Sequence, residues 1–391
     1  MKLAKCMSRL GTETAFEVLA RAKALEAQGR EIVHLEIGEP DFDTPKHIIE
    51  AACKALHSGY THYTPSAGIP ELRQAIAEEM SRTRGIPVQA ENVVVTPGGK
   101  PIMFYTILAL AEPGDEVIYP NPGFPIYESM INFTGAKPVP IPLREEYNFA
   151  FDIDEFKKLV TRKTKLIIIN SPHNPTGGIL DKETLEEIAK IAMERDIAVL
   201  SDEIYDRILY DGEFHSIASI PGMQERTIIL NGFSKTYAMT GWRVGWAVAK
   251  GDLLKPVAAI NRTAIGYVNN IAQRAALAAL TDEAEDRKWR AWMLAQYEAQ
   301  RKAMWEQLAE IPGVHVYEPE AAFYAWIRYE APLSAVEMMK YLYERGLNVR
   351  PGTEFGAMGE QHLRFTFAPS VETITAGVAI FKAAMEELRA G

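Results

Sequence analysis

The sequence predicts an α/β protein, in which helices cover both faces of a parallel sheet and a smaller α+β unit follows. Short apolar runs of strand length alternate with helical patterns over most of the chain. This alternation ends near residue 282, where one long, charged helical pattern begins. The chain has 391 residues, which is more than one ordinary core holds, so two domains are expected.

The strands expected in the first part are short and apolar, and they cover residues 31–37, 92–96, 116–119, 137–141, 165–170, 198–201 and 226–230. Helices are expected over residues 45–57, 70–82 and 100–109, because apolar residues recur at helical spacing or proline stands near the start. Helical patterns also lie between most of the later strands. Together these elements predict a large domain over residues 45–285.

The second part begins with a helix expected over residues 282–310, rich in Ala, Lys, Glu and Arg. Strands over 323–327 and 363–367 and helices over 334–345 and 371–388 are expected after it. These elements predict a small C-terminal domain over 286–391. An N-terminal arm over 1–44, with an amphipathic helix over 14–28, is expected to join this small domain.

Composition narrows the possible partners. The net charge of −10 argues against nucleic acid as the main partner. Cys6 and Cys53 show no metal-ligand spacing and no disulfide framework, so no metal is expected and the chain suits a reducing cytoplasm. The first ten residues lack a signal-peptide pattern, and no apolar run is long enough for a bilayer, so no membrane is expected.

The most informative residue is Lys235, which directly follows Ser234 and precedes Arg243 by eight positions. A lysine held on a crowded turn can form a Schiff base with an aldehyde. A nearby serine and arginine can hold a phosphate. Pyridoxal 5′-phosphate is the common cofactor that needs both groups.

A carboxylate is needed beside the pyridine nitrogen of such a cofactor, to keep the ring protonated. Asp202 follows an apolar strand, and ligands of these folds bind at the carboxyl ends of parallel strands. An isolated Asp here can instead cap a helix. The adjacent Glu203 is expected to point elsewhere.

The ring's hydroxyl oxygen needs hydrogen-bond donors. Asn174 lies in a loop fixed by two prolines and a glycine, and Tyr205 follows Asp202 by three residues. Considered alone, Asn174 could equally be a turn residue, and Tyr205 could equally be an aromatic residue of the core. His173 is expected to be structural rather than a catalytic base.

The phosphate also needs backbone N–H groups at a helix start, which Gly99 and Lys100 supply beside Ser234 and Arg243. An aromatic residue should also stack on the ring, and Phe124 follows a strand, although an isolated phenylalanine is more often a core residue. Arg364 lies inside an apolar strand, where a guanidinium must be paired, and it suits an α-carboxylate as well as a structural ion pair.

Taken in order, these residues resemble the aspartate aminotransferase family of fold-type-I pyridoxal-phosphate enzymes. The most specific motifs are Asn174-Pro175-Thr176-Gly177, Asp202-Glu203-Ile204-Tyr205, and Ser234-Lys235 with Gly241-Trp242-Arg243. The resemblance covers nearly the whole chain. It implies a large domain with a mostly parallel seven-stranded sheet, pyridoxal 5′-phosphate as cofactor, and a homodimer with shared active sites.

The resemblance also implies a role for each site residue. It implies catalytic roles for Lys235, Asp202 and Tyr205. Implied as cofactor-binding are Gly99, Lys100, Phe124, Asn174, Asp202, Tyr205, Ser234, Lys235 and Arg243, with Tyr63 reaching the phosphate of the neighbouring subunit. Implied as substrate-binding are Gly38, Asn174, Arg364 and Lys100. Phe124 stands where many relatives have tryptophan, and Ala321-Ala322-Phe323 where relatives often have Gly-Ala-Phe, which bears on the substrate pocket.

The implied reaction is a ping-pong transfer of an amino group from an L-amino acid to a 2-oxo acid, with aspartate or glutamate and 2-oxoglutarate favoured. The side-chain carboxylate of such an acidic substrate, its distal carboxylate, would bind Lys100 or, less readily, Arg262. Aromatic residues such as Tyr267, Phe323 and Tyr324 could instead favour aromatic or aliphatic donors.

Three other functions compete with this one. A carbon–sulfur β-lyase of the same fold shares the cofactor residues, and nothing in the sequence excludes it. A pyridoxal-phosphate-sensing transcription regulator would need a DNA-binding domain for which the first thirty residues leave no room. A dinucleotide-binding enzyme is disfavoured because no G-x-G-x-x-G motif follows the first strand.

Overall fold

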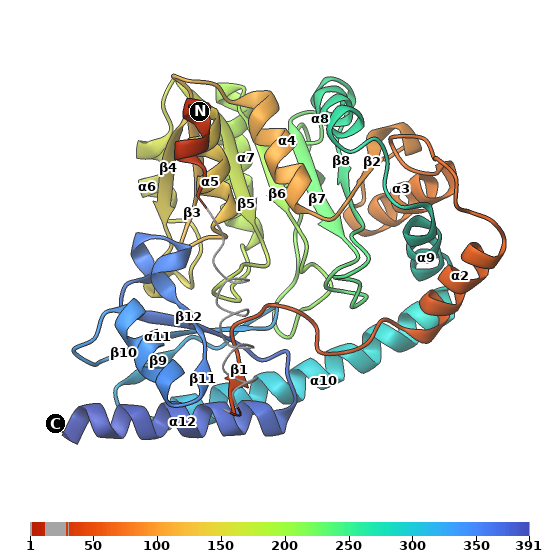
Figure 1. Cartoon of the computed structure of the whole chain (residues 1–391). Helices are drawn as coiled ribbons and strands as arrows, with labels where there is room; N and C mark the ends of the chain where they lie inside the picture. Colours follow the sequence, from red (N-terminus) through yellow and green to blue (C-terminus); the bar gives the residue numbers. More distant parts are fainter. Residues whose placement is uncertain (1, 12–28, 30, 391) are drawn as a thin grey trace.

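The computed structural model describes residues 2–11, 29 and 31–390 (Figure 1). Its central sheet has seven strands in the order β2-β8-β7-β6-β5-β3-β4. Their bounds are β2 Val93–Thr96, β3 Glu116–Asn121, β4 Lys137–Pro142, β5 Thr164–Asn170, β6 Ala198–Asp202, β7 Thr227–Gly232 and β8 Gly245–Val248. Only β8 is antiparallel to its neighbours. The mostly parallel seven-stranded sheet is therefore confirmed, whereas β8 was not expected.

Helices cover both faces of this sheet because successive buried residues of a strand point to opposite sides. In β5, Leu166 and Ile168 pack in one cluster with α4 (Lys100–Leu110), α5 (Ile126–Thr134) and α8 (Gly251–Ala264). Ile167 and Ile169 point to the opposite face and pack in a second cluster with α6 (Ile153–Leu159) and α7 (Lys182–Arg195). The β2–β8 end is covered by α2 (Lys46–His57), α3 (Pro70–Arg84) and α9 (Asn270–Thr281).

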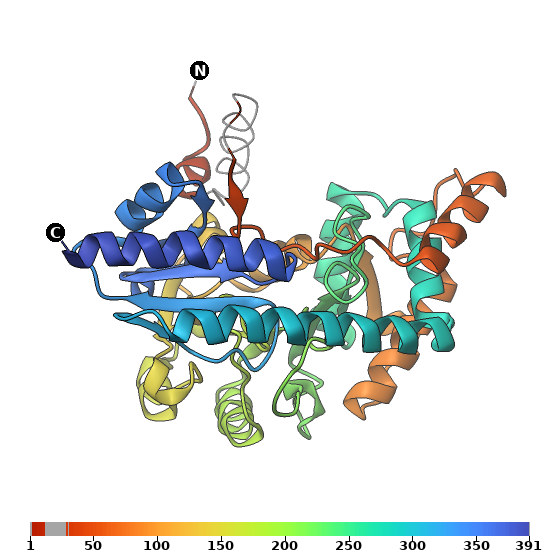
Figure 2. The same cartoon turned by 90° about the horizontal axis from the view of Figure 1, so that it is seen from below.

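The C-terminal elements surround a second, antiparallel sheet of order β12-β13-β10-β9. Its strands are β9 Val314–Val316, β10 Tyr324–Tyr329, β12 Arg350–Pro351 and β13 His362–Thr366. Its helices are α10 Glu283–Ala309, α11 Ala335–Glu344 and α12 Val371–Ala390. Figure 2 shows α10 and α12 running along this sheet, and their buried residues share its core.

The N-terminal segment joins the C-terminal unit through a two-stranded parallel sheet of β1 (Val33–His34) and β11 (Leu347–Asn348). The strand expected over 31–37 is therefore much shorter than predicted. The helix expected over 14–28 lies outside the described residues. The domain boundaries stay a prediction, and α10 runs across the boundary placed at residue 286.

Short 3-10 turns complete the described elements: η1 Lys5–Arg9, η2 Ala90–Asn92, η3 Glu145–Tyr147, η4 Ile217–Ser219, η5 Gly352–Phe355 and η6 Ala357–Gly359. Within the described part of the chain, no helix combines the length and apolar character needed to cross a bilayer.

One edge of the large sheet faces the C-terminal unit (Figure 1). β2 runs in the same direction as β7, because each is antiparallel to β8. The carboxyl ends of β2, β3, β5, β6 and β7 therefore meet at one edge. Loops that follow these strands carry most of the residues that the sequence singled out.

Candidate functional site

A cavity of about 520 Å³ lies where the carboxyl ends of the parallel strands meet the C-terminal unit. Of the predicted site residues, it is lined by Gly38, Gly99, Lys100, Phe124, Asn174, Asp202, Tyr205, Ser234, Lys235, Arg243 and Arg364. Tyr63 does not line it; its side chain is 86% exposed. The fold thus gathers residues that are spread over more than 300 positions of the chain.

Asp202 ends β6 and is buried on the cavity wall. One carboxylate oxygen accepts a hydrogen bond from the Tyr127 hydroxyl at 2.6 Å, and the other accepts one from the Ile204 N–H at 3.3 Å. Burial raises the pKa of Asp202 from 3.8 to about 6, and the hydrogen bond from Tyr127 opposes that rise. A cationic ring nitrogen is the kind of partner that this carboxylate suits.

Glu203 points away from the cavity, as expected. Its side chain pairs with Arg84 of α3 at 2.8 Å, and Arg84 also pairs with Asp206 at 2.6 Å. Ser201 and Ser216 donate to the remaining oxygen of Glu203. This buried network fixes the backbone on both sides of Asp202, so the two adjacent acids have different roles.

The amine of Lys235 is half-buried and donates to the backbone oxygen of Gly38. It also lies 5.6 Å from the ring centre of Phe323. A Cβ on Gly38 would overlap the hydroxyl of Tyr324 and approach its Cζ to 2.7 Å. Only glycine therefore fits between Lys235 and Tyr324 without moving the tyrosine.

Arg364 is a buried cation in the middle of β13. One terminal nitrogen donates to Asn174 Oδ1 at 3.1 Å and the other to the backbone oxygen of Glu36 at 2.6 Å. Its guanidinium also stacks on Tyr324 at 4.4 Å from the ring centre. Burial lowers the pKa of Arg364, and its Nε has no partner in the described part of the chain.

Tyr205 is buried and shares a hydrogen bond of 2.7 Å with Tyr324. Burial raises the pKa of Tyr205 well above its ordinary value, so its hydroxyl stays protonated and can donate. Asn174 is held by its N–H, which donates to Asn170 Oδ1 at 3.0 Å. Because its own Oδ1 faces Arg364, its Nδ2 remains the available donor.

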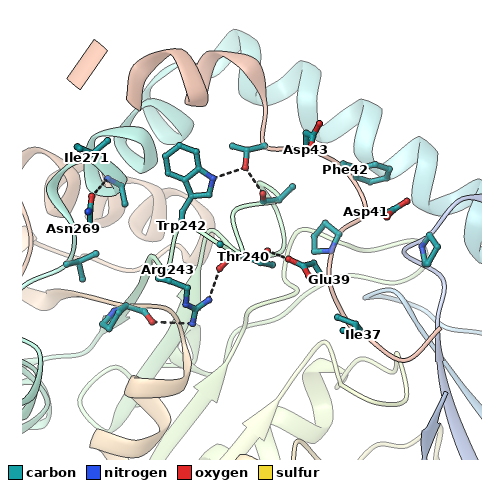
Figure 3. Close-up of a pocket in the computed structure, with 18 of the residues that line it drawn as sticks. Ile37, Glu39, Asp41, Phe42, Asp43, Thr240, Trp242, Arg243, Asn269 and Ile271 are labelled. Carbon is teal, nitrogen blue, oxygen red and sulfur yellow. Dashed lines mark hydrogen bonds between the residues drawn. The ribbon is translucent and has the colours of Figure 1, made fainter. Parts of the chain in front are cut away.

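The start of α4 and the Arg243 loop form the part of the cavity that suits a phosphate. Gly99 is the N-cap of α4, and a Cβ on Gly98, whose φ is +90°, would overlap the Arg243 guanidinium. Arg243 itself has a φ of +56°, a left-handed conformation. Its terminal nitrogens donate to the backbone oxygens of Thr240 and Pro97 (Figure 3).

Lys100 and Arg262 were both candidates for a distal carboxylate, and the structure separates them. Lys100 lines the cavity, with its amine 5.8 Å from the ring centre of Phe124. Arg262 is exposed near the end of α8 and does not line it. Of the aromatic candidates, Tyr324 lines the cavity, whereas Phe323 lies in the core behind it.

His173 is fully buried beside the cavity. Its Nδ1 lies 2.7 Å from the hydroxyl of Thr176. Burial lowers the pKa of His173 to about 3, so the ring is neutral at ordinary pH. This environment supports the structural role expected for it.

Sequence reasoning missed Tyr127 and Arg350, both of which line the cavity. Tyr127 is three residues past Phe124, but nothing in the sequence shows that it faces Asp202. Arg350 carried a weaker signal than Arg364, because it stands between Val349 and Pro351 in a short segment that also contains Asn348.

The donors and charges of the cavity fit pyridoxal 5′-phosphate. The cavity is lined by the lysine Lys235, the carboxylate of Asp202, the neutral donors of Asn174 and Tyr205, and Arg243. The start of α4 also lines it, and its N-cap residue makes no side-chain hydrogen bond. Asp202 could hold the ring nitrogen, Asn174 and Tyr205 the phenolic oxygen, and Gly99, Ser234 and Arg243 the phosphate. Phe124 lines the same wall as Lys100 and could cover a ring face.

Comparisons with known proteins agree with this chemistry. The family model described as aminotransferase class I and II matches residues 30–381. The chain is 41% identical to an aspartate aminotransferase of Pyrococcus horikoshii over 95% of this chain and 94% of the relative. It is also 41% identical to aromatic-amino-acid aminotransferase 2 of Thermococcus litoralis, over 89% and 90%. The aspartate aminotransferase of Thermus thermophilus solved with maleate superposes with a TM-score of 0.95 at 36% identity, covering 98% of this chain and 100% of that one.

Proposed function

This chain belongs to the class I and II aminotransferases and is a pyridoxal-phosphate enzyme, and we propose that it transfers the amino group of aspartate to 2-oxoglutarate, giving glutamate, with glutamate as the amino donor in the reverse direction. The observation that carries the proposal is the single cavity in which Lys235, Asp202 and Arg364 converge. The bound cofactor supplies an electron sink for the carbon that loses its proton. Every other step depends on residues of the chain.

Lys235 is the residue that we assign to the proton transfer. Its Nζ is held at the backbone oxygen of Gly38, on the cavity wall. The unprotonated amine of Lys235 would take the Cα proton of the bound substrate and later give it back, as a general base and then a general acid. Asp202 would hold the ring nitrogen of the cofactor in its protonated form through its buried carboxylate.

Arg364 orients the amino acid. Its stacking on Tyr324 and its bond to Asn174 hold the planar guanidinium so that an α-carboxylate can be bound in two-point fashion. Gly38 keeps the backbone close to that position. The Cα proton would then lie in the cavity that Lys235 also lines.

An acidic substrate needs a second cation in the cavity. Lys100 is the one that the sequence offered, and its place on the wall supports that role. The relative of known structure in Thermus thermophilus was solved with maleate, which is a dicarboxylate. The Thermococcus litoralis relative, named for aromatic amino acids, makes aromatic donors the second candidate.

The enzyme is proposed to act as a homodimer with shared active sites. A second, open cavity of about 1240 Å³ adjoins the first, and Arg243, Thr240 and Glu39 line both (Figure 3). Tyr63, whose side chain is exposed and touches Tyr267 on the wall of this second cavity, is available to another subunit. We also propose a cytoplasmic location, supported by the unpaired thiols of Cys6 and Cys53.

Mixing the holoenzyme with single amino acids, with no acceptor present, tests the substrate class. The absorbance band of the cofactor should change with aspartate and glutamate and persist with alanine and phenylalanine. A response to phenylalanine alone would replace the proposal by the aromatic one. Release of pyruvate and ammonia would indicate the lyase reaction instead.

The shared site has its own test. Lys235→Ala and Tyr63→Ala subunits, each impaired alone, should regain activity when they are mixed and re-associated. A hybrid dimer then contains one site with both native residues. No recovery in hybrids shown to have formed would contradict the assignment of Tyr63.

A further inference from the structure

Arg350 places a second buried cation beside Arg364. It begins β12, and its Cα lies directly opposite that of Arg364 in the antiparallel pair β12–β13. Opposed residues of such a pair carry their side chains on the same face of the sheet. Both arginines line the catalytic cavity. In Figure 1, β12 lies on the side of the C-terminal unit nearest the large sheet.

The surroundings of Arg350 do not satisfy it. Only 2% of the residue is exposed, and its Nε forms an ion pair with Glu354 that lacks the geometry of a hydrogen bond. Its two terminal nitrogens have no hydrogen-bond partner among the residues that the structure describes. Arg350 thus has one anionic partner, Glu354, at Nε, and its terminal nitrogens on the cavity wall could bind a second anion.

We infer that Arg350 binds the distal carboxylate of the substrate, and that Glu354 is the counter-ion which this carboxylate displaces. The inference rests on the proposed acidic substrates. The α-carboxylate would bind Arg364, and the other end of a short dicarboxylate would reach the arginine opposite. Lys100 lines the same cavity, so Arg350 would bind this carboxylate together with Lys100, whereas Arg262 does not line the cavity.

This arrangement predicts opposite effects for the two members of the ion pair. Removal of Arg350 removes an attraction for dicarboxylates. Removal of the Glu354 charge removes a competitor, and Arg350 then attracts a dicarboxylate more strongly. A purely structural ion pair would not produce effects of opposite sign on ligand selectivity.

The test measures binding of succinate and butyrate to the holoenzyme by calorimetry. The two acids have the same chain length and differ by one carboxylate, so the ratio of their dissociation constants reports the distal contact. We expect Arg350→Met to lower the preference for succinate at least about tenfold, the size of a lost charge-assisted hydrogen bond. Arg350→Lys should retain part of the preference, and Glu354→Gln should increase it about threefold or more.

Controls separate the possible failures. If Arg350→Met does not fold because Glu354 loses this ion pair, the double variant R350M/E354Q removes both charges and should show the same loss. An unchanged ratio in a folded Arg350 variant, or a loss found only in Lys100→Met, would overturn the role of Arg350 and leave the substrate class intact. A wild-type enzyme with no preference for succinate would overturn the acidic substrate class, and the inference with it.

Discussion

Asp202 and Arg364 are buried charges of opposite sign in one cavity, and they come from different kinds of sheet. Asp202 ends a parallel strand of the large sheet, and Arg364 lies in the middle of an antiparallel strand of the C-terminal sheet. Asp202 accepts one of its hydrogen bonds from the N–H of Ile204, two residues further on. Both hydrogen bonds of Arg364 go to segments far away in the sequence.

The difference shows how each sheet builds a site. At the end of a parallel strand the chain turns, and the turn itself presents side chains and free N–H groups to a ligand. In the middle of an antiparallel strand the backbone is already paired, so a charge there depends on groups from elsewhere. We therefore propose that Asp202, Lys235 and Asn174 form a cofactor side of the cavity, and that Arg364 and Arg350 form a substrate side.

The largest effect is expected on the cofactor side. Lys235→Ala should lower kcat more than about a thousandfold, or about 4 kcal/mol of barrier, because the proton-transferring amine is lost. Steady-state kinetics and circular dichroism would measure turnover and fold. Lys255→Ala, at an exposed lysine, is the control and should be silent. Turnover above a thousandth of wild type would contradict the assignment.

A smaller effect is expected on the substrate side. In Arg364→Lys, one ammonium cannot reach both Asn174 and the Glu36 carbonyl, and it stacks less well on Tyr324. We expect kcat/KM to fall about 100-fold, or about 3 kcal/mol. Arg345→Lys is matched to it, since Arg345 stacks on Tyr341 and pairs with Glu387 at the surface. If Arg364→Lys and Arg345→Lys lower kcat/KM equally, Arg364 has no special part in substrate binding.

The pH dependence of stability isolates Asp202 in cofactor-free protein. Its folded pKa of about 6 exceeds its ordinary 3.8, so its contribution to stability is complete below pH 3.8 and is lost as pH rises through 6. Relative to Asp202→Asn, the wild-type free energy of unfolding should fall by about 2 kcal/mol between pH 4.5 and 7.5. Urea denaturation across this range measures it. Asp252→Asn, at an exposed carboxylate, should show no such fall, and a flat difference for Asp202 would refute the raised pKa.

The smallest expected effect concerns the hydrogen bond from Tyr127 to Asp202. Tyr127→Phe should lower the free energy of unfolding of the cofactor-free protein by about 1 kcal/mol at pH 7.5. It should also raise the pKa of Asp202 further, because this bond favours the ionised form. Tyr147→Phe, at an exposed ring, provides the comparison. If both variants are equally stable at every pH, Tyr127 does not support the carboxylate.

Local sequence patterns were enough to predict the parallel strands and the residues at their ends. Apolar runs followed by polar loops predict where Asp202, Asn174 and Lys235 lie, because the carboxyl ends of parallel strands share one edge. The resemblance to aminotransferases then supplied roles that spacing alone left open, such as those of Tyr205 and Phe124. Arg364 was visible because a guanidinium in an apolar strand must have a partner.

Which distant side chains meet depends on how the folded elements pack together. Nothing in the local pattern places the Tyr127 hydroxyl on Asp202, or sets Arg350 opposite Arg364, because both depend on the packing of one element against another. Strand β8 escaped prediction for the same reason, since its four residues become a strand by pairing with β2 and β7. Local sequence specifies what a segment can form, and the contacts made on folding decide which partner satisfies its charges and hydrogen bonds.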